Sequence, residues 1–205
     1  MKAKRIILAA RALSLVFTPF YLPIVGLVVL LTFSYLSLLP LVYKLFLLFT
    51  FWLSTVIIPT ALIRLYRHYQ GWTRLQLGNR ERRMIPYVIS ILSYMMCYYF
   101  MALTHVPRFM GSVLIAALVV QVACAIVNVW VKVSTHTAAI GGMAGALVAF
   151  SLIFSFNPVW WLCLIILVSG LVGTSRMILR QHSLGEVVGG FLLGLCCACC
   201  SVLLF

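Results

Sequence analysis

The residues best suited to chemistry lie in one short stretch, TSRMILRQHSLGEVVGG, residues 174–190. Its Glu186 is one of only two acidic residues in a chain of 205, and it falls where one apolar segment meets the next. A carboxylate near a membrane core is costly unless it has a partner. Glu186 could have a structural role, because Ser183-Leu-Gly-Glu186 has the spacing of a helix capping box. It could also belong to a charged site, since the same stretch holds Arg176 and His182.

Two further polar segments carry cations. The segment 64–86 contributes Arg64, Arg67, Arg74, Arg80, Arg82 and Arg83. The segment 132–136 contributes Lys132, Ser134, Thr135 and His136. A surface with many guanidinium groups, two histidines and one carboxylate suits a multiply charged anion, and phosphate fits the bidentate geometry of arginine best. These residues predict a phosphate ester as the substrate.

Composition determines which elements must position these residues. Apolar residues make up 65% of the chain and charged residues 8%, outside the range of soluble globular proteins. We therefore expect an all-α, polytopic transmembrane helical bundle that forms one integral membrane domain over residues 1–205, with no nucleic-acid partner. The N-terminal KAKR and its apolar run lack a suitably placed cleavage site, so we expect them to be retained.

Charges and prolines divide the apolar sequence into about six to seven candidate spans. Their ranges are 13–39, 41–63, 87–104, 110–131, 136–156, 159–175 and 184–205. In the first range, Pro19 and Pro23 predict either one kinked span or a re-entrant segment followed by a short helix.

Short turns around VPRFM and FNPVW join two pairs of spans as helical hairpins. This connectivity brings the active-site segments 74–86, 132–136 and 175–186 to one side of the bilayer. The glycines of GGMAGA at 141–146, with Gly190 and Gly194, predict close packing of the fifth and last helices of the bundle.

The cysteines do not indicate a metal site. All seven lie inside apolar runs, and CCACC at 196–200 has no His or acidic residue nearby to complete a coordination shell. We interpret them as packing residues, with reversible acylation as the alternative. We expect no metal or other cofactor.

In its three polar segments, 74–86, 132–136 and 175–186, the chain resembles the type 2 phosphatidic acid phosphatase (PAP2) superfamily of membrane lipid phosphatases. The third family motif, Ser-Arg, five residues, His, three residues, acidic, is similar to Ser175-Arg176, MILRQ, His182, SLG, Glu186, with Glu in place of Asp. The second, Pro-Ser-Gly-His, corresponds to VSTH at 133–136, without the Pro and Gly. The first, Lys, six residues, Arg-Pro, is degraded to NRERRMIP, where the Lys position falls on Leu75 or Gln76.

This resemblance implies roles for individual residues. His182 would be the nucleophile that forms a phosphohistidine, Glu186 would orient it, and His136 would be the general acid. The i, i+4 spacing of His182 and Glu186 agrees, because it puts both side chains on one helix face. The resemblance also implies phosphate ligands and a mechanism that needs no metal. These ligands would be Arg176, Ser134, Arg82, Arg83 and Arg80.

The function expected from these residues is removal of phosphate from a lipid phosphomonoester or diphosphate in the bilayer. Candidate substrates are phosphatidic acid, phosphatidylglycerophosphate and a polyprenyl diphosphate. We expect the protein in a bacterial inner (cytoplasmic) membrane. The positive-inside rule orients the basic face toward the cytoplasm, whereas bacterial members of the family usually orient the site outward.

The sequence also permits roles without catalysis for these residues. His136 could be an interfacial histidine, and Ser134 with Thr135 could cap the fifth helix. The whole basic face could serve a binding protein or small transporter for an anionic lipid that has no catalytic activity. A binder needs the arginines but has no use for a nucleophile and an acid, so the histidine pair favours an enzyme.

Overall fold

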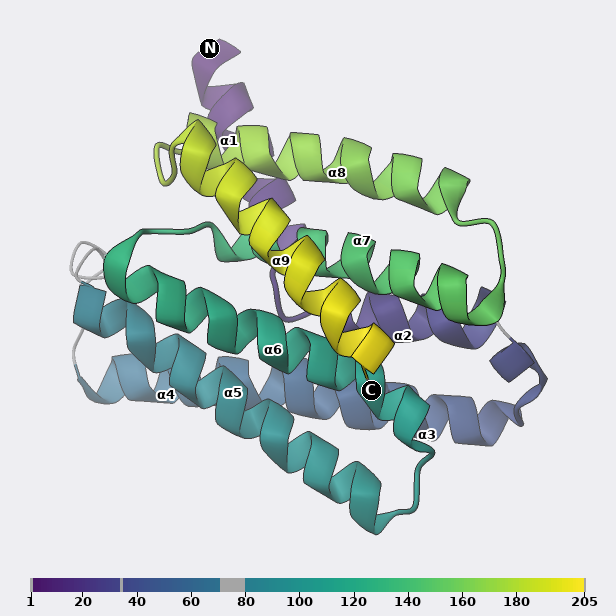
Figure 1. Ribbon diagram of the computed structural model, residues 1–205. Helices are drawn as coiled ribbons and strands as arrows, with labels where there is room; N and C mark the ends of the chain where they lie inside the picture. Colours follow the sequence, from purple (N-terminus) through teal and green to yellow (C-terminus); the bar gives the residue numbers. More distant parts are fainter. Residues whose placement is uncertain (1, 34, 71–79, 205) are drawn as a thin grey trace.

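The computed structural model describes residues 2–33, 35–70 and 80–204, and the regular elements within these ranges are all helical. The α-helices are α1 (Lys2–Val16), α2 (Leu22–Phe33), α3 (Leu41–Trp52), α4 (Ile58–Tyr69), α5 (Arg80–Leu103), α6 (Arg108–Trp130), α7 (Thr135–Phe154), α8 (Val159–Ile178) and α9 (Leu184–Leu204). Two short elements complete them, a 3₁₀ turn η1 (Tyr35–Leu38) and a π turn η2 (Leu53–Ile57). Figure 1 shows the long helices packed side by side as a bundle.

Six helices in the described part of the chain are long and apolar enough to cross a membrane, which confirms the predicted helical bundle. They are Leu41–Tyr69, Met84–Leu103, Met110–Trp130, Thr135–Phe154, Val159–Ile178 and Leu184–Leu204. The hairpin turns around VPRFM and FNPVW are present, joining α5 to α6 and α7 to α8. The protein is therefore an integral membrane protein.

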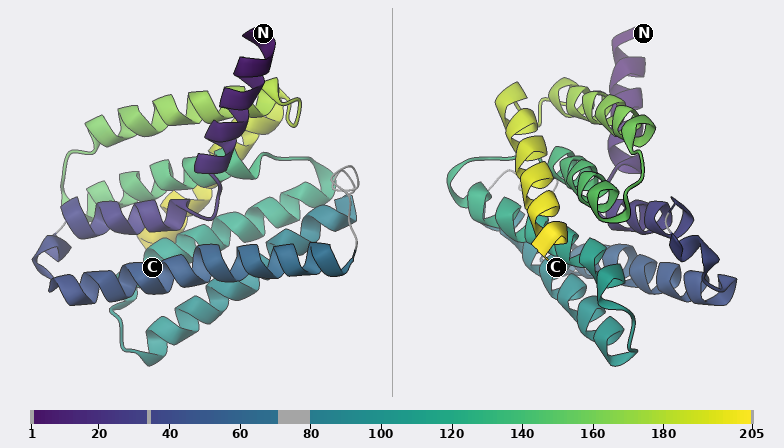
Figure 2. Two further views of the ribbon diagram at one scale, coloured as in Figure 1. Left: turned by 180° about the vertical axis from the view of Figure 1, so that it is seen from behind. Right: turned by 45° about the vertical axis from the view of Figure 1, so that its right-hand side comes forward.

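The predicted first span, 13–39, is not one helix. α1 ends at Val16, and after a turn through Pro19 the short apolar helix α2 begins at Leu22. Figure 2 shows that α1 runs across the long helices instead of alongside them. The break follows from Pro19, which has no N–H to donate in a helix interior.

The longest span contains a π turn where α3 passes into α4. Pro59 follows this turn and cannot donate to the carbonyl four residues earlier. A widened turn leaves backbone carbonyls without intrahelical partners. The buried Ser93 hydroxyl of α5 donates to one of them, the Ser54 carbonyl, at 2.6 Å. The irregular turn is thus held by a neighbouring helix, as required inside a bilayer.

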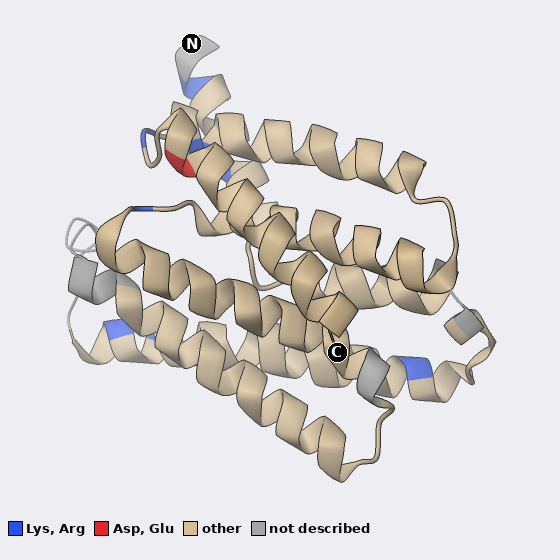
Figure 3. Cartoon of the chain, viewed as in Figure 1, with Lys and Arg blue, Asp and Glu red and all other residues tan. Residues whose placement is uncertain are grey.

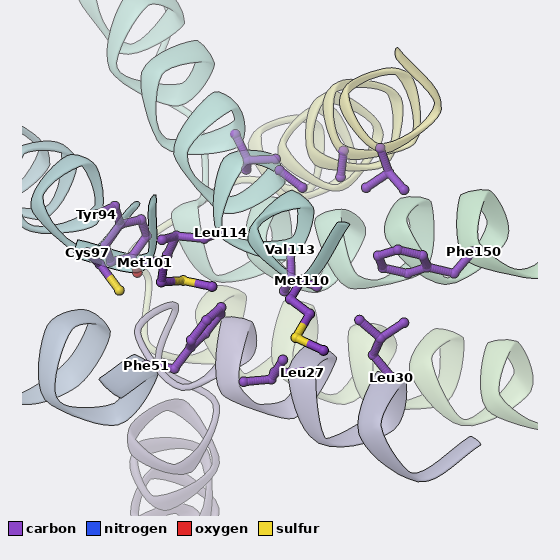
Figure 4. Close-up of a cluster of buried hydrophobic side chains, with 14 of the residues drawn as sticks. Leu27, Leu30, Phe51, Tyr94, Cys97, Met101, Met110, Val113, Leu114 and Phe150 are labelled. Atoms are coloured by element: carbon purple, nitrogen blue, oxygen red, sulfur yellow. The ribbon is translucent and has the colours of Figure 1, made fainter. Parts of the chain in front are cut away.

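The buried core joins α2 and α3 to α5 and α6 (Figure 4). Leu27, Phe51, Tyr94 and Leu114 are completely buried there. Leu30 of α2 points toward Phe150 of α7 in the same view. This packing shows how α2, although too short to span a bilayer, is held inside the bundle.

α7 and α9 cross in close contact along a line of glycines. A Cβ atom added at Gly194 would lie 1.8 Å from the Ala138 carbonyl oxygen, and one at Gly141 would lie 2.0 Å from the Phe191 carbonyl oxygen. Only glycine permits backbones to approach this closely. The predicted packing of these two helices is confirmed.

One end of the bundle gathers the α6–α7 link, the α8–α9 turn, the end of α4 and the start of α5 (Figure 1). Lys and Arg residues lie near the acidic residue at the start of α9 (Figure 3). The polar segment 64–86, which separates the predicted spans 41–63 and 87–104, is partly helical, because α4 continues to Tyr69 and α5 begins at Arg80. Which side of the membrane this end faces stays a prediction.

Substituting Gly194 with alanine should separate α7 from α9, because the new methyl group has no room beside Ala138. We expect a marked loss of thermal stability in detergent, measured as the fraction of monodisperse protein remaining after heating.

Gly189 is the matched control, since a Cβ atom there meets nothing within 4 Å. Gly189→Ala should keep or slightly raise stability, because alanine favours a helix over glycine by about 0.5–1 kcal/mol. Equal stability of the two variants would contradict the proposed close crossing.

Candidate active site

The turn between α8 and α9 determines where His182 lies. α8 ends in a Schellman motif, in which the Gln181 N–H donates to the Arg176 carbonyl at 3.1 Å and the Arg180 N–H donates to the Met177 carbonyl at 2.9 Å. Arg180 occupies the left-handed position of this motif, with φ of 53°. The chain reverses sharply there, so that His182 lies four residues after the end of α8 and two residues before the start of α9.

His182 and Glu186 form the central pair of the site. The Nδ1 atom of His182 lies 2.7 Å from the Oε2 atom of Glu186. The His182 side chain is 9% exposed and that of Glu186 is 23% exposed. Glu186 occupies Nδ1, and among the described residues no hydrogen bond is found for the other ring nitrogen, Nε2.

Glu186 also takes part in capping α9, so its structural and chemical roles coexist. Its N–H donates to the Ser183 hydroxyl oxygen at 3.4 Å, which is the first half of a capping box. In the second half the glutamate carboxylate would return to the Ser183 N–H. Here Oε2 of that carboxylate contacts His182 instead. The backbone of Glu186 serves the helix and its side chain serves the histidine.

The α6–α7 link is tied to the same turn. The Ser134 N–H donates to the Glu186 carbonyl at 3.2 Å. The Nζ atom of Lys132 donates to the Gln181 carbonyl and lies 3.9 Å from Oε2 of Glu186. In the sequence, Lys132 belongs to the active-site segment 132–136 and is a possible phosphate ligand. The structure places it beside the carboxylate of Glu186.

Arg176 reaches the site from the end of α8 and is held by α1. Its Nη1 atom donates to the Ser14 hydroxyl at 2.7 Å, and Ser14 is buried. Ser14 could not be identified from the sequence, since no motif signals a contact between residues 162 positions apart. Arg176 also interacts electrostatically with both His136 and His182.

His136 lies in the first turn of α7, two residues after Ser134, whose N–H donates to the Glu186 carbonyl. It interacts electrostatically with His182. Among the described residues, no hydrogen-bond partner is found for two buried atoms of the site, Nδ1 of His136 and Nε of Arg176. Both atoms could therefore bond to a polar ligand.

Of the remaining predicted phosphate ligands, the structure describes the side chain of Ser134 but not the side chains of the three arginines. Ser134 is completely buried, and its hydroxyl oxygen accepts from the Thr137 N–H at 3.5 Å as the N-cap of α7. The structure establishes Ser134 as the N-cap residue of α7, and its role as a phosphate ligand stays a prediction. Three arginines begin α5, and their side chains lie outside the described structure: Arg80, Arg82 and Arg83. Arg74, Leu75 and Gln76 lie outside the described residues.

The surroundings of His182 keep its imidazole neutral near pH 7. Burial lowers the pKa of His182, and the nearby Arg176 and Lys132 cations lower it further, while the hydrogen bond and charge of Glu186 oppose them. A neutral imidazole whose Nδ1–H donates to a carboxylate presents a lone pair at Nε2. The geometry therefore suits a nucleophile beside two cations. No cluster of three or more metal-ligating side chains is found in the described part of the chain.

Comparison with known proteins gives one match, and it covers the part of the chain that holds both histidines. The family model of the PAP2 superfamily matches residues 130–205, which include the α6–α7 link, the α8–α9 turn and both histidines. The chain matches no curated protein sequence and no solved structure. The C-terminal part of the chain, which carries the α6–α7 link and the α8–α9 turn, thus matches the PAP2 superfamily, and this match supports the resemblance seen in the motifs.

The electrostatics of the site predict how the pKa of His182 responds to substitution. Lys132→Met should raise this pKa by removing a cation, and Glu186→Gln should lower it by removing the carboxylate. Nuclear magnetic resonance titration of ¹⁵N-labelled histidine would measure both shifts, with the signal assigned through His182→Gln.

Lys44→Met serves as the control, because Lys44 lies at the other end of the bundle and donates to the Ser37 carbonyl.

The lowered pKa of His182 also predicts how stability depends on pH. Since the unfolded chain binds the imidazole proton of His182 more tightly than the folded chain does, the contribution of His182 to the free energy of unfolding should diminish below about pH 6.5. A pKa of about 6.5 or higher in the wild type would refute these electrostatics.

Proposed function

We propose that this protein is a member of the PAP2 superfamily and a membrane lipid phosphatase that hydrolyses a lipid phosphomonoester or diphosphate through a phosphohistidine on His182. The observation that carries the proposal is the 2.7 Å contact between His182 Nδ1 and Glu186 Oε2. A histidine oriented by a carboxylate, with its other nitrogen free, is the arrangement of an activated nucleophile.

In the first step, Nε2 of His182 attacks phosphorus and the bond from phosphorus to the lipid oxygen breaks. The charge of the resulting imidazolium ring is stabilised by the carboxylate of Glu186. The departing oxygen takes a proton from His136, which is the proposed general acid. The lipid alcohol, or the lipid monophosphate in the case of a diphosphate, then leaves.

In the second step, water attacks the phosphohistidine. His136, now deprotonated, accepts a proton from this water, and the bond between phosphorus and Nε2 breaks. Inorganic phosphate is released and His182 returns to its neutral form. The same histidine, His136, therefore serves as acid and then as base.

The cations of the site would bind the non-bridging phosphate oxygens, over which charge is spread in phosphoryl transfer. Arg176 is the principal ligand, since it interacts electrostatically with both histidines and has an unpaired buried Nε among the described contacts. The first turn of α7 adds an anion site at a helix N-terminus. Arg82 and Arg83 are the candidates for the arginine of the first motif, and Arg74 or Arg80 would replace its missing lysine.

A binder or transporter for anionic lipids is the second candidate. The basic face alone fits it, but the oriented His182 does not, because binding an anion gains nothing from a neutral nucleophile. The catalytic function is therefore favoured.

The test is phosphate release from a panel of lipid phosphates by the detergent-purified protein in the presence of EDTA. The panel contains phosphatidic acid, phosphatidylglycerophosphate and a polyprenyl diphosphate. Wild-type protein should release phosphate from at least one of them. His182→Ala should release none, and His136→Ala should be slower by roughly 10²–10⁴-fold.

His105→Ala is the matched control, because His105 is exposed in the turn between α5 and α6, at the end of α6 opposite the α6–α7 link. It should keep wild-type activity. If no lipid phosphate is hydrolysed while folded wild type and His182→Ala bind the same headgroup equally, the protein is a binder and the proposal fails.

A further inference from the structure

The helix α1 reaches the proposed catalytic site through one buried serine. α1 packs against α8, the helix whose last turn carries Arg176 (Figure 1). Ser14 is buried, and so is Ala10, which lies one turn earlier on the same face of α1. On the opposite face, Arg5 and Val16 are exposed. Ser14 therefore belongs to the inner face of α1, which packs against the bundle.

Ser14 contacts two residues of the site through two different groups. Its hydroxyl oxygen accepts a hydrogen bond from Nη1 of Arg176 at 2.7 Å. Its backbone makes a hydrogen bond to the side chain of His136. Arg176 belongs to α8 and His136 to α7, so this one serine connects the proposed phosphate ligand with the proposed general acid.

The bond to Ser14 occupies one side of the guanidinium group and leaves another side for an anion. In a guanidinium group, Nε and Nη2 share one edge, from which two parallel N–H bonds can reach two oxygens of one phosphate, while Nη1 lies beyond this edge. Nε of Arg176 is buried and has no hydrogen-bond partner among the described residues. A guanidinium group held at Nη1 therefore presents its Nε edge in a fixed direction.

We propose that Ser14 is a positioning residue, which fixes the Nε edge of Arg176 for the phosphate from an anchor that also contacts His136. The proposal rests on the proposed function and adds α1 to the site. The family match begins at residue 130, so the matched part of the chain does not contain this anchor.

A neutral hydroxyl suits this role better than a carboxylate would. An acidic residue at this position would pair with Arg176 and offset the positive charge that a phosphate needs. Glu186 contacts His182 and Lys132 instead. An arginine that is already fixed also loses less conformational entropy when the anion binds. Ser14 thus orders Arg176 without reducing its charge.

Binding of inorganic phosphate tests this role without turnover. Detergent-purified protein with ¹⁵N-labelled histidine would be titrated with phosphate at constant pH and ionic strength, and the shift of the His182 signal would give the Kd. Ser14→Ala should weaken binding by roughly three- to tenfold, which corresponds to the entropy of immobilising one long side chain. Unchanged binding in Ser14→Ala would overturn the proposal.

A double-mutant cycle shows whether Ser14 acts through Arg176. Arg176→Lys keeps the positive charge, but an ammonium group has no planar edge for Ser14 to orient. In this background, Ser14→Ala should change phosphate binding by less than about twofold. An equal loss of binding in both backgrounds would also overturn the proposal, because the two residues would then act independently.

Ser93→Ala is the matched control for the loss of a buried hydrogen bond. It removes the bond from the Ser93 hydroxyl to the Ser54 carbonyl, which joins two helical elements in the middle of α5. This variant should lose thermal stability in detergent and keep the phosphate binding of the wild type. If it weakens phosphate binding as much as Ser14→Ala does, the effect is one of general stability and the positioning role is removed.

The two proposals fail separately. Phosphate binding that depends on Ser14 through Arg176, in a protein that hydrolyses no lipid phosphate, would leave the positioning role standing and remove the enzyme. Hydrolysis by wild-type protein, with phosphate binding and kcat/KM unchanged in Ser14→Ala, would leave the enzyme standing and remove the positioning role.

Discussion

The close contact between α7 and α9 is the constraint on which the site depends. Gly190 lies so near the start of α7 that a Cβ atom there would be 2.7 Å from the Ser134 carbonyl oxygen. At this crossing the Ser134 N–H donates to the Glu186 carbonyl. His136 follows Ser134 by two residues, and Glu186 contacts His182 through its carboxylate. One backbone contact therefore fixes the two histidines relative to each other.

The electrostatics of the site follow from the scarcity of acidic residues. The chain has a formal net charge of +13, and its two acidic residues leave most cations without a carboxylate partner. Glu186 is shared between His182 at 2.7 Å and Lys132 at 3.9 Å. Arg176 bonds to a hydroxyl instead, that of Ser14. This arrangement retains positive charge for an anion and uses the carboxylate of Glu186 to orient a histidine.

The parts of this arrangement that depend on local spacing could be predicted from the sequence. The i, i+4 relation of His182 and Glu186, the capping box at Ser183 and the glycine spacing of α7 and α9 are short-range patterns with one geometric outcome. The hairpin turns brought the α6–α7 link and the α8–α9 turn to the same end, and the hydrogen bond from Ser134 to Glu186 joins them.

Long-range placement could not be predicted. Hydropathy does not show that α1 crosses the bundle, because the same apolar residues would suit a span. Pro19 marked a possible break but did not determine the direction of the chain after it. The contact of Ser14 with Arg176 depends on that direction. The start of α5 at Arg80 was also missed, since arginines have good helix propensity but resemble loop residues beside an apolar segment.

The most direct test of the mechanism is to identify the residue that carries phosphate during turnover. Wild-type protein and the His136→Ala variant, which lacks the acid of the first step and the base of the second, would be mixed with a lipid phosphate labelled in its phosphoryl group and quenched under alkaline conditions during turnover. Peptide mapping should place the label on His182, and Glu186→Gln introduced into the same background should reduce the amount formed. Label on any other residue, or turnover by the wild type with no covalent phosphate in either variant, would contradict a mechanism based on His182.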